Sequence, residues 1–305
     1  MNSDAPPPFR DKIPLSQAIV WIVLSTVLIS GSVGMCIFYY LHLRDQRTRD
    51  PQYEISAILQ TGGQKETLKT VFLAELLDLS VDKPTNLYRF NTQEAQQKLL
   101  KCPLIAKAKL KKIKPSTILV NYTLRQPIAF LGDYTNTAID KKGFLFPFKP
   151  FFTPKKLPEI YLGYLKEPQQ EIWGSHLSGE ASELAFTLFQ LTSRHCSSES
   201  TYIRKIDVSK AFAPSYGQRQ IILIIEELLE RQVEGRVLLC TFPQIVRLSA
   251  EHFRQGIANY LALRPFLKKQ ALSLPLTEDV NLFKGQEVII DLRIPHLAYI
   301  QPGIS

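Results

Sequence analysis

Residues 13–43 contain no Asp, Glu, Lys or Arg, and residues 18–41 form the apolar centre of this stretch. Twelve of these 24 residues are Leu, Ile, Val or Phe. As a helix they span about 36 Å, which is enough to cross a hydrocarbon core of about 30 Å. Trp21 near one end, and Tyr39 and Tyr40 near the other, occupy the positions of an interfacial aromatic belt. We therefore expect residues 15–43 to form a transmembrane anchor.

The main alternative for this segment is a cleaved signal peptide. The apolar region of such a peptide has only about 7–15 residues and ends at a small-residue cleavage site, which this sequence lacks. The charges that flank the segment assign no side of the membrane, because Arg10 and Lys12 precede it and three arginines follow it. The sequence thus predicts a single-pass anchor between a short tail, residues 1–14, and one soluble body.

Three small residues of the anchor, Thr26, Ser30 and Gly34, are spaced by four. This spacing aligns them on one helix face and permits close approach of another helix. The alternative is that they are ordinary small residues of a membrane span. We hypothesise that this small-residue stripe packs against the anchors of partner proteins.

The composition favours folded domains over disorder, since 45% of the residues are apolar and 21% are charged. The four cysteines, Cys36, Cys102, Cys196 and Cys240, have no C-x-x-C spacing, which argues against a disulfide-dense scaffold and a structural zinc site. They are interpreted as buried thiols, with one pairing among the last three left open.

The net charge of +9 is concentrated in a stretch that has seven lysines and no acid, residues 98–114. Lys107, Lys109 and Lys111 alternate there with small apolar residues, so a strand would place them together on one face. No aromatic residue interleaves with these lysines and no DNA-binding motif accompanies them, so we expect no nucleic-acid partner. The expected role of this basic face is to meet water, anionic lipid or an acidic partner.

The region that follows the anchor is expected to fold as two helices on a three-stranded sheet. Residues 54–59 and the turn pair Gly62 and Gly63 indicate a first strand, and apolar residues at helical spacing over 68–79 indicate a first helix. Asn91 with Glu94 predicts the start of a second helix. Two strands follow, residues 105–113 and 117–124.

Five segments of this region occur in a recognisable order: residues 86–91, 103–110, 115–120, 125–129 and 139–146. In this order, after an N-terminal anchor, they resemble the POTRA domain of the bacterial division protein family FtsQ/DivIB. The family usually has an acid before the arginine of this region, where this chain has Leu124 before Arg125. The resemblance implies an α+β fold, with a POTRA domain at residues 53–148 and a distal β domain at residues 149–302.

The second half of the chain predicts a mixed α/β domain with a mainly antiparallel sheet. Its start, residues 146–158, is rich in Pro and Phe and is interpreted as a linker. Residues 180–194 predict a helix, and Ser249 is expected to cap another. Strands are expected at residues 203–209, 220–226, 237–240, 245–248, 288–292 and 297–300. The strands at 203–209, 245–248 and 288–292 contain segments similar to the same family. Residues 226–245 fit the family poorly.

No residue pattern indicates catalysis, and no cofactor or metal is expected. The five histidines are scattered, and the sequence has no nucleophile elbow, Walker loop or dinucleotide fingerprint. A non-enzymatic scaffold is therefore favoured, and a membrane-anchored envelope enzyme acting on cell-wall material is the alternative.

The resemblance implies a cell division protein of the inner membrane at the septum, with its body outside the cytoplasm. Its partners would be FtsB/FtsL (DivIC)-type bitopic proteins, which link it to septal peptidoglycan synthesis. The last strand, at residues 297–300, is expected to be a sheet edge that accepts a partner strand. The residues that the resemblance assigns to this contact are Arg293, Ile294, His296, Leu297, Ala298, Tyr299 and Ile300, with Tyr299 as the main anchor and Arg293 paired with a partner acid. The alternative is that residues 297–300 only complete the domain core.

Overall fold

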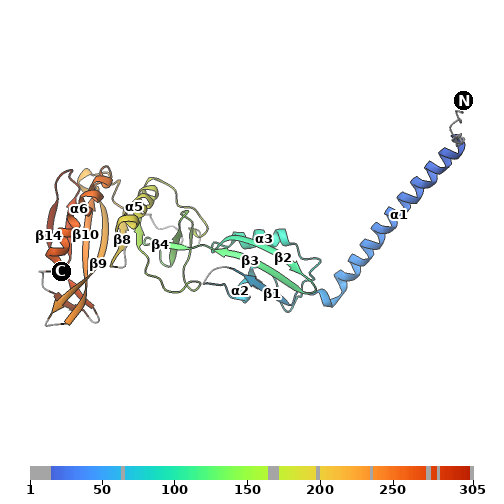
Figure 1. The fold of residues 1–305 in the computed structure, drawn as a ribbon, viewed down its shortest axis with the longest axis horizontal. Helices are drawn as coiled ribbons and strands as arrows, with labels where there is room; N and C mark the ends of the chain where they lie inside the picture. The colour runs from blue at the N-terminus through green and yellow to red at the C-terminus, as the bar shows by residue number, and fades with distance from the viewer. Residues whose placement is uncertain are drawn as a thin grey trace, which may run out of the picture.

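The computed structural model describes residues 15–62, 66–163, 172–196, 200–233, 236–272, 276–279 and 282–302. The expected tail, residues 1–14, and Gly63 lie outside these residues. Three parts follow one another along the molecule: a long helix, a small sheet with two helices, and a larger mixed sheet with helices (Figure 1). The architecture is α+β, which confirms the predicted fold class.

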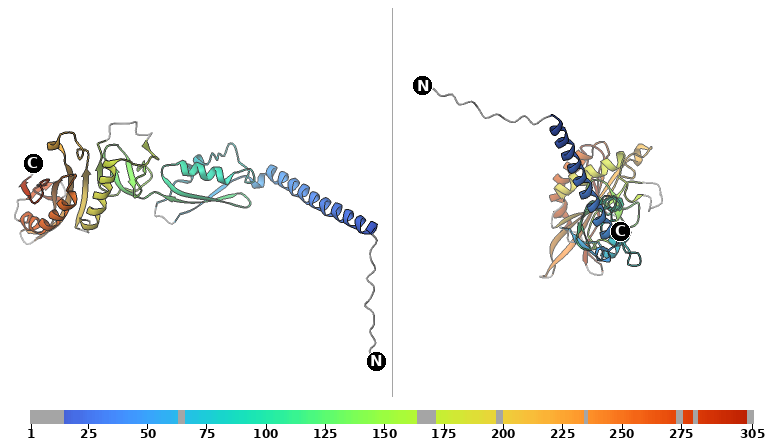
Figure 2. Two further views of the ribbon diagram at one scale, coloured as in Figure 1. Left: turned by 90° about the horizontal axis from the view of Figure 1, so that it is seen from above. Right: turned by 90° about the vertical axis from the view of Figure 1, so that its right-hand side faces the viewer.

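Helix α1 (Leu15–Arg49) extends away from the rest of the molecule in Figure 1 and in the left view of Figure 2. Its 35 residues have a length of about 52 Å. An 18-residue window of this helix has a mean hydropathy of 2.1 and is not buried against any part of the protein. Within the described residues, α1 is thus the one helix whose length and composition suit a membrane span, and it continues six residues past the predicted end at residue 43.

The joint between α1 and the small sheet is made by polar and aromatic contacts. A 3-10 turn, η1 (Pro51–Tyr53), follows α1, and the Asp50 carboxylate caps it by accepting the Gln52 N–H at 2.9 Å. The Asn86 amide nitrogen donates to the Arg47 carbonyl oxygen at 3.0 Å. The rings of Tyr53 and Tyr88 meet edge to face, with centroids 5.1 Å apart.

The first sheet has the strand order β1-β3-β2, with β1 (Ala57–Thr61), β2 (Ile105–Ile113) and β3 (Thr117–Leu124). Strand β1 runs parallel to β3, and β2 runs antiparallel to it. Helices α2 (Thr70–Leu76) and α3 (Thr92–Lys101) complete this part of the fold. The predicted order of strand, helix, helix, strand and strand is confirmed.

Local sequence signals set the ends of α3 and the faces of β2. The Asn91 side chain accepts the N–H groups of Gln93 and Glu94, as its capping position predicts. Lys107, Lys109 and Lys111 are exposed on β2, and Ala108 and Leu110 are buried. Ala106 is exposed, contrary to the strict alternation, because the pairing register shifts between residues 105 and 107.

The second sheet has 11 strands among the described residues. Its main path runs β11-β12-β10-β9-β8-β7-β4-β5-β6, and β13 and β14 branch from β10. The strands are β4 (Pro127–Leu131), β5 (Thr137–Asp140), β6 (Leu145–Pro147), β7 (Glu159–Tyr161), β8 (Thr201–Asp207), β9 (Ile221–Val233), β10 (Arg236–Leu248), β11 (Leu276–Asp279), β12 (Leu282–Gly285), β13 (Val288–Leu292) and β14 (Tyr299–Pro302). Helix α5 (Glu180–Cys196) packs on β8, helix α6 (Phe253–Ala271) packs on β10 and β13, and the short turn η2 (Tyr216–Gln218) precedes β9.

Strands β9 and β10 form one long antiparallel hairpin, which the sequence predicted as three shorter strands and an unassigned segment. Glu226 and Glu227 are buried in β9. The predicted strand ends at Glu226, but β9 continues through Glu227, which pairs with Arg264 of α6 inside the fold. The continuous apolar run at residues 221–225 favours a strand covered on both faces, but Ile222 and Ile224 are only half buried, so this expectation is wrong.

Ser249 does not cap a helix, which corrects another sequence prediction. Its hydroxyl oxygen accepts the Glu251 N–H at 3.3 Å within a turn. Helix α6 begins four residues later, at Phe253, with His252 at its N-cap position and no side-chain hydrogen bond there. Its apolar face is as predicted, because Ile257 and Tyr260 are buried in the core of the second sheet.

The segment interpreted as a linker is instead packed between the two sheets. Residues 145–147 form β6, and Phe146, Phe148 and Phe152 are buried in the core of the first sheet. The Pro-rich composition misled the prediction because β6 has only one neighbour among the described strands, β5, so that Pro147 ends a short edge strand. The last strand of the first sheet ends at Leu124, but the core of that sheet includes aromatic residues as far as Phe152. The predicted domain boundary at residue 148 stays a prediction.

A second set of contacts ties the same segment to the first sheet. The Lys155 ammonium pairs with the Glu66 carboxylate at 2.6 Å, and the Thr153 hydroxyl donates to the same oxygen at 2.8 Å. The Arg125 guanidinium pairs with the Asp140 carboxylate at 2.8 Å, with both side chains largely buried. Arg125 follows β3 directly and Asp140 ends β5, so this ion pair also joins the two sheets.

Candidate partner-binding surface

Strand β14 lies at an edge of the second sheet. It pairs antiparallel with β13, from Asp291 opposite Tyr299 to Val288 opposite Pro302. In the described part of the chain no strand pairs with its other side. The expected edge position is therefore observed, but the strand starts two residues later than predicted. Leu297 and Ala298 precede it, because a turn with His296 at a φ of 63° ends just before them.

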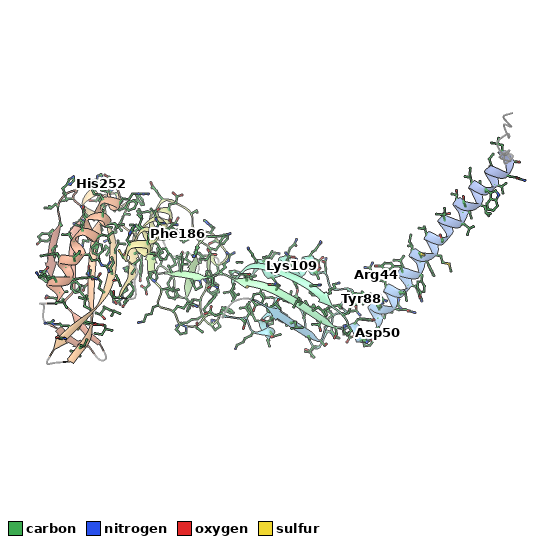
Figure 3. All side chains as sticks on the ribbon, viewed as in Figure 1. Arg44, Asp50, Tyr88, Lys109, Phe186 and His252 are labelled. Atoms are coloured by element: carbon green, nitrogen blue, oxygen red, sulfur yellow. The ribbon has the colours of Figure 1, made fainter. Side chains whose placement is uncertain are left out.

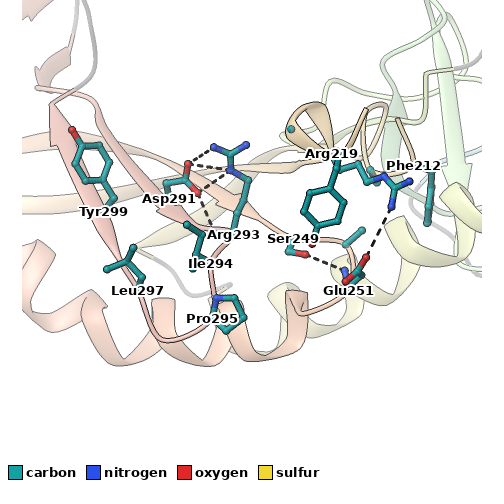
Figure 4. A pocket seen from close by; sticks show the side chains of 14 residues that line it. Phe212, Arg219, Ser249, Glu251, Asp291, Arg293, Ile294, Pro295, Leu297 and Tyr299 are labelled. Carbon is teal, nitrogen blue, oxygen red and sulfur yellow. Dashed lines mark hydrogen bonds and ion pairs between the residues drawn. The ribbon is translucent and has the colours of Figure 1, made fainter. Parts of the chain in front are cut away.

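A groove of about 850 Å³ opens beside this edge (Figure 4). One wall is the segment from Asp291 to Tyr299, and the other is formed by a loop before β9 and the turn after β10. The lining residues are Ala211, Phe212, Tyr216, Gly217, Arg219, Ser249, Ala250, Glu251, Asp291, Arg293, Ile294, Pro295, Leu297 and Tyr299.

Large apolar and aromatic side chains are exposed along the groove. Ile294, Leu297 and Tyr299 are exposed on one wall, and Phe212 and Tyr216 on the other. Tyr299 has 60% of its surface accessible, and Ile300 packs against the core. Of the predicted contact residues, only Ile300 thus serves the core, and the others face the solvent or the groove. A contiguous set of this kind is typical of an interaction surface.

Arg293 already has an acidic partner within the chain. Its Nη2 lies 2.7 Å from Asp291 Oδ2, and its Nε lies 3.0 Å from Asp291 Oδ1. Burial raises the pKa of Asp291, but the hydrogen bonds from Arg293 outweigh burial and hold that pKa below its usual value. A partner acid at Arg293 would therefore share the guanidinium with Asp291.

The opposite wall contains a second arginine, which the sequence did not single out. Arg219 Nε donates to the Ala213 carbonyl at 2.9 Å, and its Nη1 lies 4.0 Å from Glu251 Oε1. Its guanidinium carbon is 5.6 Å from the centroid of the Tyr216 ring. Phe212, Tyr216 and Arg219 lie about 80 residues before β14 and carry no motif, so only the tertiary fold brings them to the groove.

The small-residue stripe of α1 is accessible along the helix. The Ser30 hydroxyl donates to the Thr26 carbonyl at 2.7 Å, and the Thr26 hydroxyl donates to the Ile22 carbonyl at 2.8 Å. These bonds satisfy the polar groups within the helix, and a side chain at Gly34 would meet no atom within 4 Å. Packing of this stripe against another helix stays a prediction.

The described residues contain no group of three or more His, Cys, Asp or Glu side chains that could hold a metal ion. Cys102, Cys196 and Cys240 are buried and unpaired, and Cys36 is exposed on α1. Burial raises the pKa of the Cys102 and Cys196 thiols. Raised pKa values disfavour the reactive thiolate, so these two thiols have the properties of structural core residues.

The fold defines a class of protein in which a long apolar helix precedes a small β-α-α-β-β unit and a larger, mostly antiparallel sheet. Residues 73–121, from α2 into β3, match the family model of the FtsQ-type POTRA domain. The chain therefore carries an FtsQ-type POTRA domain, consistent with the FtsQ/DivIB family. No curated protein matches the chain.

Proposed function

We propose that this protein is a non-enzymatic, membrane-anchored scaffold of the bacterial division machinery. The FtsQ-type POTRA domain at residues 73–121 supports a role in division, and α1 supports an anchor in the inner membrane. In this proposal residues 1–14 lie in the cytoplasm and the body lies in the periplasm at the septum. The scaffold links early division proteins to septal peptidoglycan synthesis.

The partner that we propose is a bitopic coiled-coil protein of the FtsB/FtsL (DivIC) type, bound at β14. The observation that carries this proposal is the open edge of β14 beside exposed Ile294, Leu297 and Tyr299. Such an edge offers unpaired main-chain N–H and C=O groups to an added strand. Main-chain hydrogen bonds supply affinity, and the apolar side chains and Arg293 select the partner.

Replacement of Tyr299 by Ala in the full-length protein tests this docking mode. An aromatic anchor at the centre of an interface contributes about 2 kcal/mol or more, so the dissociation constant for the coiled-coil partner is expected to rise about thirtyfold. The matched control is Phe266→Ala on α6, because Phe266 is also an aromatic residue with 58% of its surface exposed and lies outside the groove. This control is expected to leave partner binding unchanged.

A second variant, Ala298→Pro, tests the strand rather than the side chain. Proline removes an N–H just before β14 and restricts the chain that enters it. If the Tyr299→Ala and Ala298→Pro variants both fold normally and bind the partner as tightly as the unmodified chain, docking at this edge is excluded. Turnover of peptidoglycan fragments by the purified protein would contradict the non-enzymatic assignment.

The orientation is tested in spheroplasts with an external protease. The proposal expects the protease to remove everything that follows α1, because the body is periplasmic. Full protection of the body would place it in the cytoplasm.

A further inference from the structure

Four cationic side chains gather where α1 meets the first sheet. Arg44 and Arg47 lie three residues apart on α1 and therefore share a helix face. Lys112 is the second-last residue of β2, and Lys114 directly follows the end of that strand. Figure 3 labels Arg44 and Tyr88 at this joint, and Lys109 farther along the sheet.

The helix and the strand bring these cations to the same place. The Arg47 guanidinium carbon lies 5.9 Å from the centroid of the Tyr88 ring, and the Lys114 ammonium lies 6.0 Å from the same centroid. Partial burial, and then the charge of nearby Arg44, lower the pKa of Lys112. Arg47 and Lys114 thus both approach the Tyr88 ring, and the charge of Arg44 acts on Lys112. We name Arg44, Arg47, Lys112 and Lys114 the junction cations.

Acids of the described chain do not neutralise the junction cations. None of the four takes part in an ion pair within 4.0 Å among the residues that the structure describes. The acids next to them in sequence are engaged elsewhere. Asp45 pairs with Arg49 at 2.9 Å, and Asp50 accepts the Gln52 N–H. Arg44, Arg47 and Lys114 are exposed and Lys112 is half exposed, so all four can reach an external anion.

The junction cations lie at the depth of lipid headgroups if α1 spans a bilayer. Arg44 is three residues past Leu41, the last residue of the apolar centre, and Arg47 is six residues past it. These separations correspond to about 4.5 and 9 Å along the helix. The headgroup region on each side of the hydrocarbon core is about 5–8 Å thick, so Arg44 lies within it and Arg47 at its outer boundary. The contact of Asn86 with the Arg47 carbonyl holds the sheet, with Lys112 and Lys114, at this same level.

We propose that the junction cations form a docking site for the phosphate groups of anionic phospholipids, which holds the first sheet against the bilayer surface. The inference rests on the proposed anchoring of α1 but on no division partner. Clustered cations beside a membrane helix attract anionic headgroups, each by about 1 kcal/mol, a factor of about five in affinity. Two lysines of the basic face, Lys107 and Lys109, are unsuited to this contact, because they lie about 10 to 17 Å farther along β2 than Lys112.

The test uses the full-length protein in mixed micelles that contain equal amounts of phosphatidylglycerol and phosphatidylcholine. The lipid retained on the purified protein is extracted and the ratio of the two lipids is measured. The unmodified protein is expected to retain more phosphatidylglycerol. The variant Lys112→Gln with Lys114→Gln is expected to reduce this preference by up to about thirtyfold, since it removes two of the four cations. The control Lys107→Gln with Lys109→Gln removes the same charge from the same strand and is expected to keep the preference.

Hydrogen exchange in lipid nanodiscs gives an independent readout of the docked surface. Amides at residues 111–116 are expected to exchange more slowly when the bilayer contains phosphatidylglycerol than when it contains phosphatidylcholine alone. This difference should vanish in the Lys112→Gln, Lys114→Gln variant, while its thermal unfolding matches that of the control variant.

Three results would overturn the proposal. The first is an equal phosphatidylglycerol preference in both double variants, or no preference in the unmodified protein. The second is displacement of the lipid by inorganic phosphate at low concentration, which would indicate a site for free phosphate. The third is protection of residues 111–116 by a polyglutamate peptide without any lipid dependence, which would indicate an acidic protein partner. Because no division protein is present, failure here is distinct from failure of partner docking at β14.

Discussion

The two joints of this molecule are built from different interactions. Between α1 and the first sheet, the contacts are a hydrogen bond from Asn86 and the edge-to-face pair of Tyr53 and Tyr88. Between the two sheets, the side chains of Phe146, Phe148 and Phe152 are buried, and two ion pairs cross the boundary. Burial of large apolar surface stabilises far more than a single hydrogen bond.

We infer from this difference that the two sheets hold together as one body. The joint between α1 and this body is weaker than the joint between the two sheets. The sheet-to-sheet joint shares its core with the first sheet, so the two sheets cannot separate without exposing phenylalanine side chains. Among the described residues, the helix joint has no comparable apolar core. We therefore expect the body to turn relative to α1 more readily than its two sheets turn relative to each other.

The largest expected effect comes from Phe146→Ala. Phe146 has no exposed surface, and truncation of a fully buried phenylalanine lowers the free energy of unfolding by about 3–5 kcal/mol. Thermal unfolding of the full-length protein measures the loss. The control Phe266→Ala, at an exposed aromatic residue, is expected to change stability by less than about 0.5 kcal/mol. Equal melting temperatures of the two variants would show that the sheet-to-sheet joint adds little.

A smaller effect is expected from Asn86→Ala at the helix joint. This change removes the donor to the Arg47 carbonyl and the acceptor of the Tyr88 N–H, which Asn86 Oδ1 binds at 2.8 Å. The expected loss is about 1–2 kcal/mol, because each net hydrogen bond contributes about 1 kcal/mol. Hydrogen exchange should become faster at residues 44–50 and stay unchanged at residues 145–152. Faster exchange in both segments would contradict the independence of the two joints.

The smallest expected effect is a loss of stability at acidic pH, which arises from Glu66 at the sheet-to-sheet joint. Burial raises the pKa of Glu66, but the hydrogen bonds from Lys155 and Thr153 outweigh it and lower that pKa below the ordinary 4.5. The folded state therefore binds its proton less readily than the unfolded state, and the stabilisation is present above pH 4.5 and lost as the pH falls below it.

Replacement of Lys155 by Ala removes this acid dependence. The ammonium is partly exposed, so the contribution is below about 1 kcal/mol after solvent screening. Denaturant titrations at neutral and acidic pH measure the difference for the unmodified protein and the variant. An identical pH dependence of the two would show that the pair of Glu66 and Lys155 does not stabilise the joint.

The elements with local signals were predicted from the sequence, and those fixed by distant contacts were not. Helix α3 starts where Asn91 caps it, and β3 has its predicted bounds because apolar residues alternate along it. The long hairpin was missed because the acids Glu226 and Glu227 indicate a strand end until Arg264 of α6 is placed beside Glu227. Phe146 and its neighbours were assigned to a linker because proline density is a local signal, whereas their burial depends on the first sheet.

The candidate surface divides in the same way. The edge strand was predicted from its position at the end of the chain. It starts two residues later than predicted, because the turn that contains His296 lies just before it. The second wall of the groove was not predicted, because Phe212 and Tyr216 belong to a loop whose position the sequence pattern does not specify. The internal pairing of Arg293 with Asp291 needs side-chain geometry that a strand pattern does not contain.

The way β14 attaches to the sheet bears on when its edge forms during folding. Among the described strands, β14 joins the sheet only through β13, and β13 joins it only at residues 244–248 of β10, 44 residues away in the chain. Pairing of such distant segments costs the loop-closure entropy of the chain between them. The proposed docking edge therefore exists only once β10, β13 and β14 have paired. A partner that recognises this edge would bind folded molecules and not nascent ones.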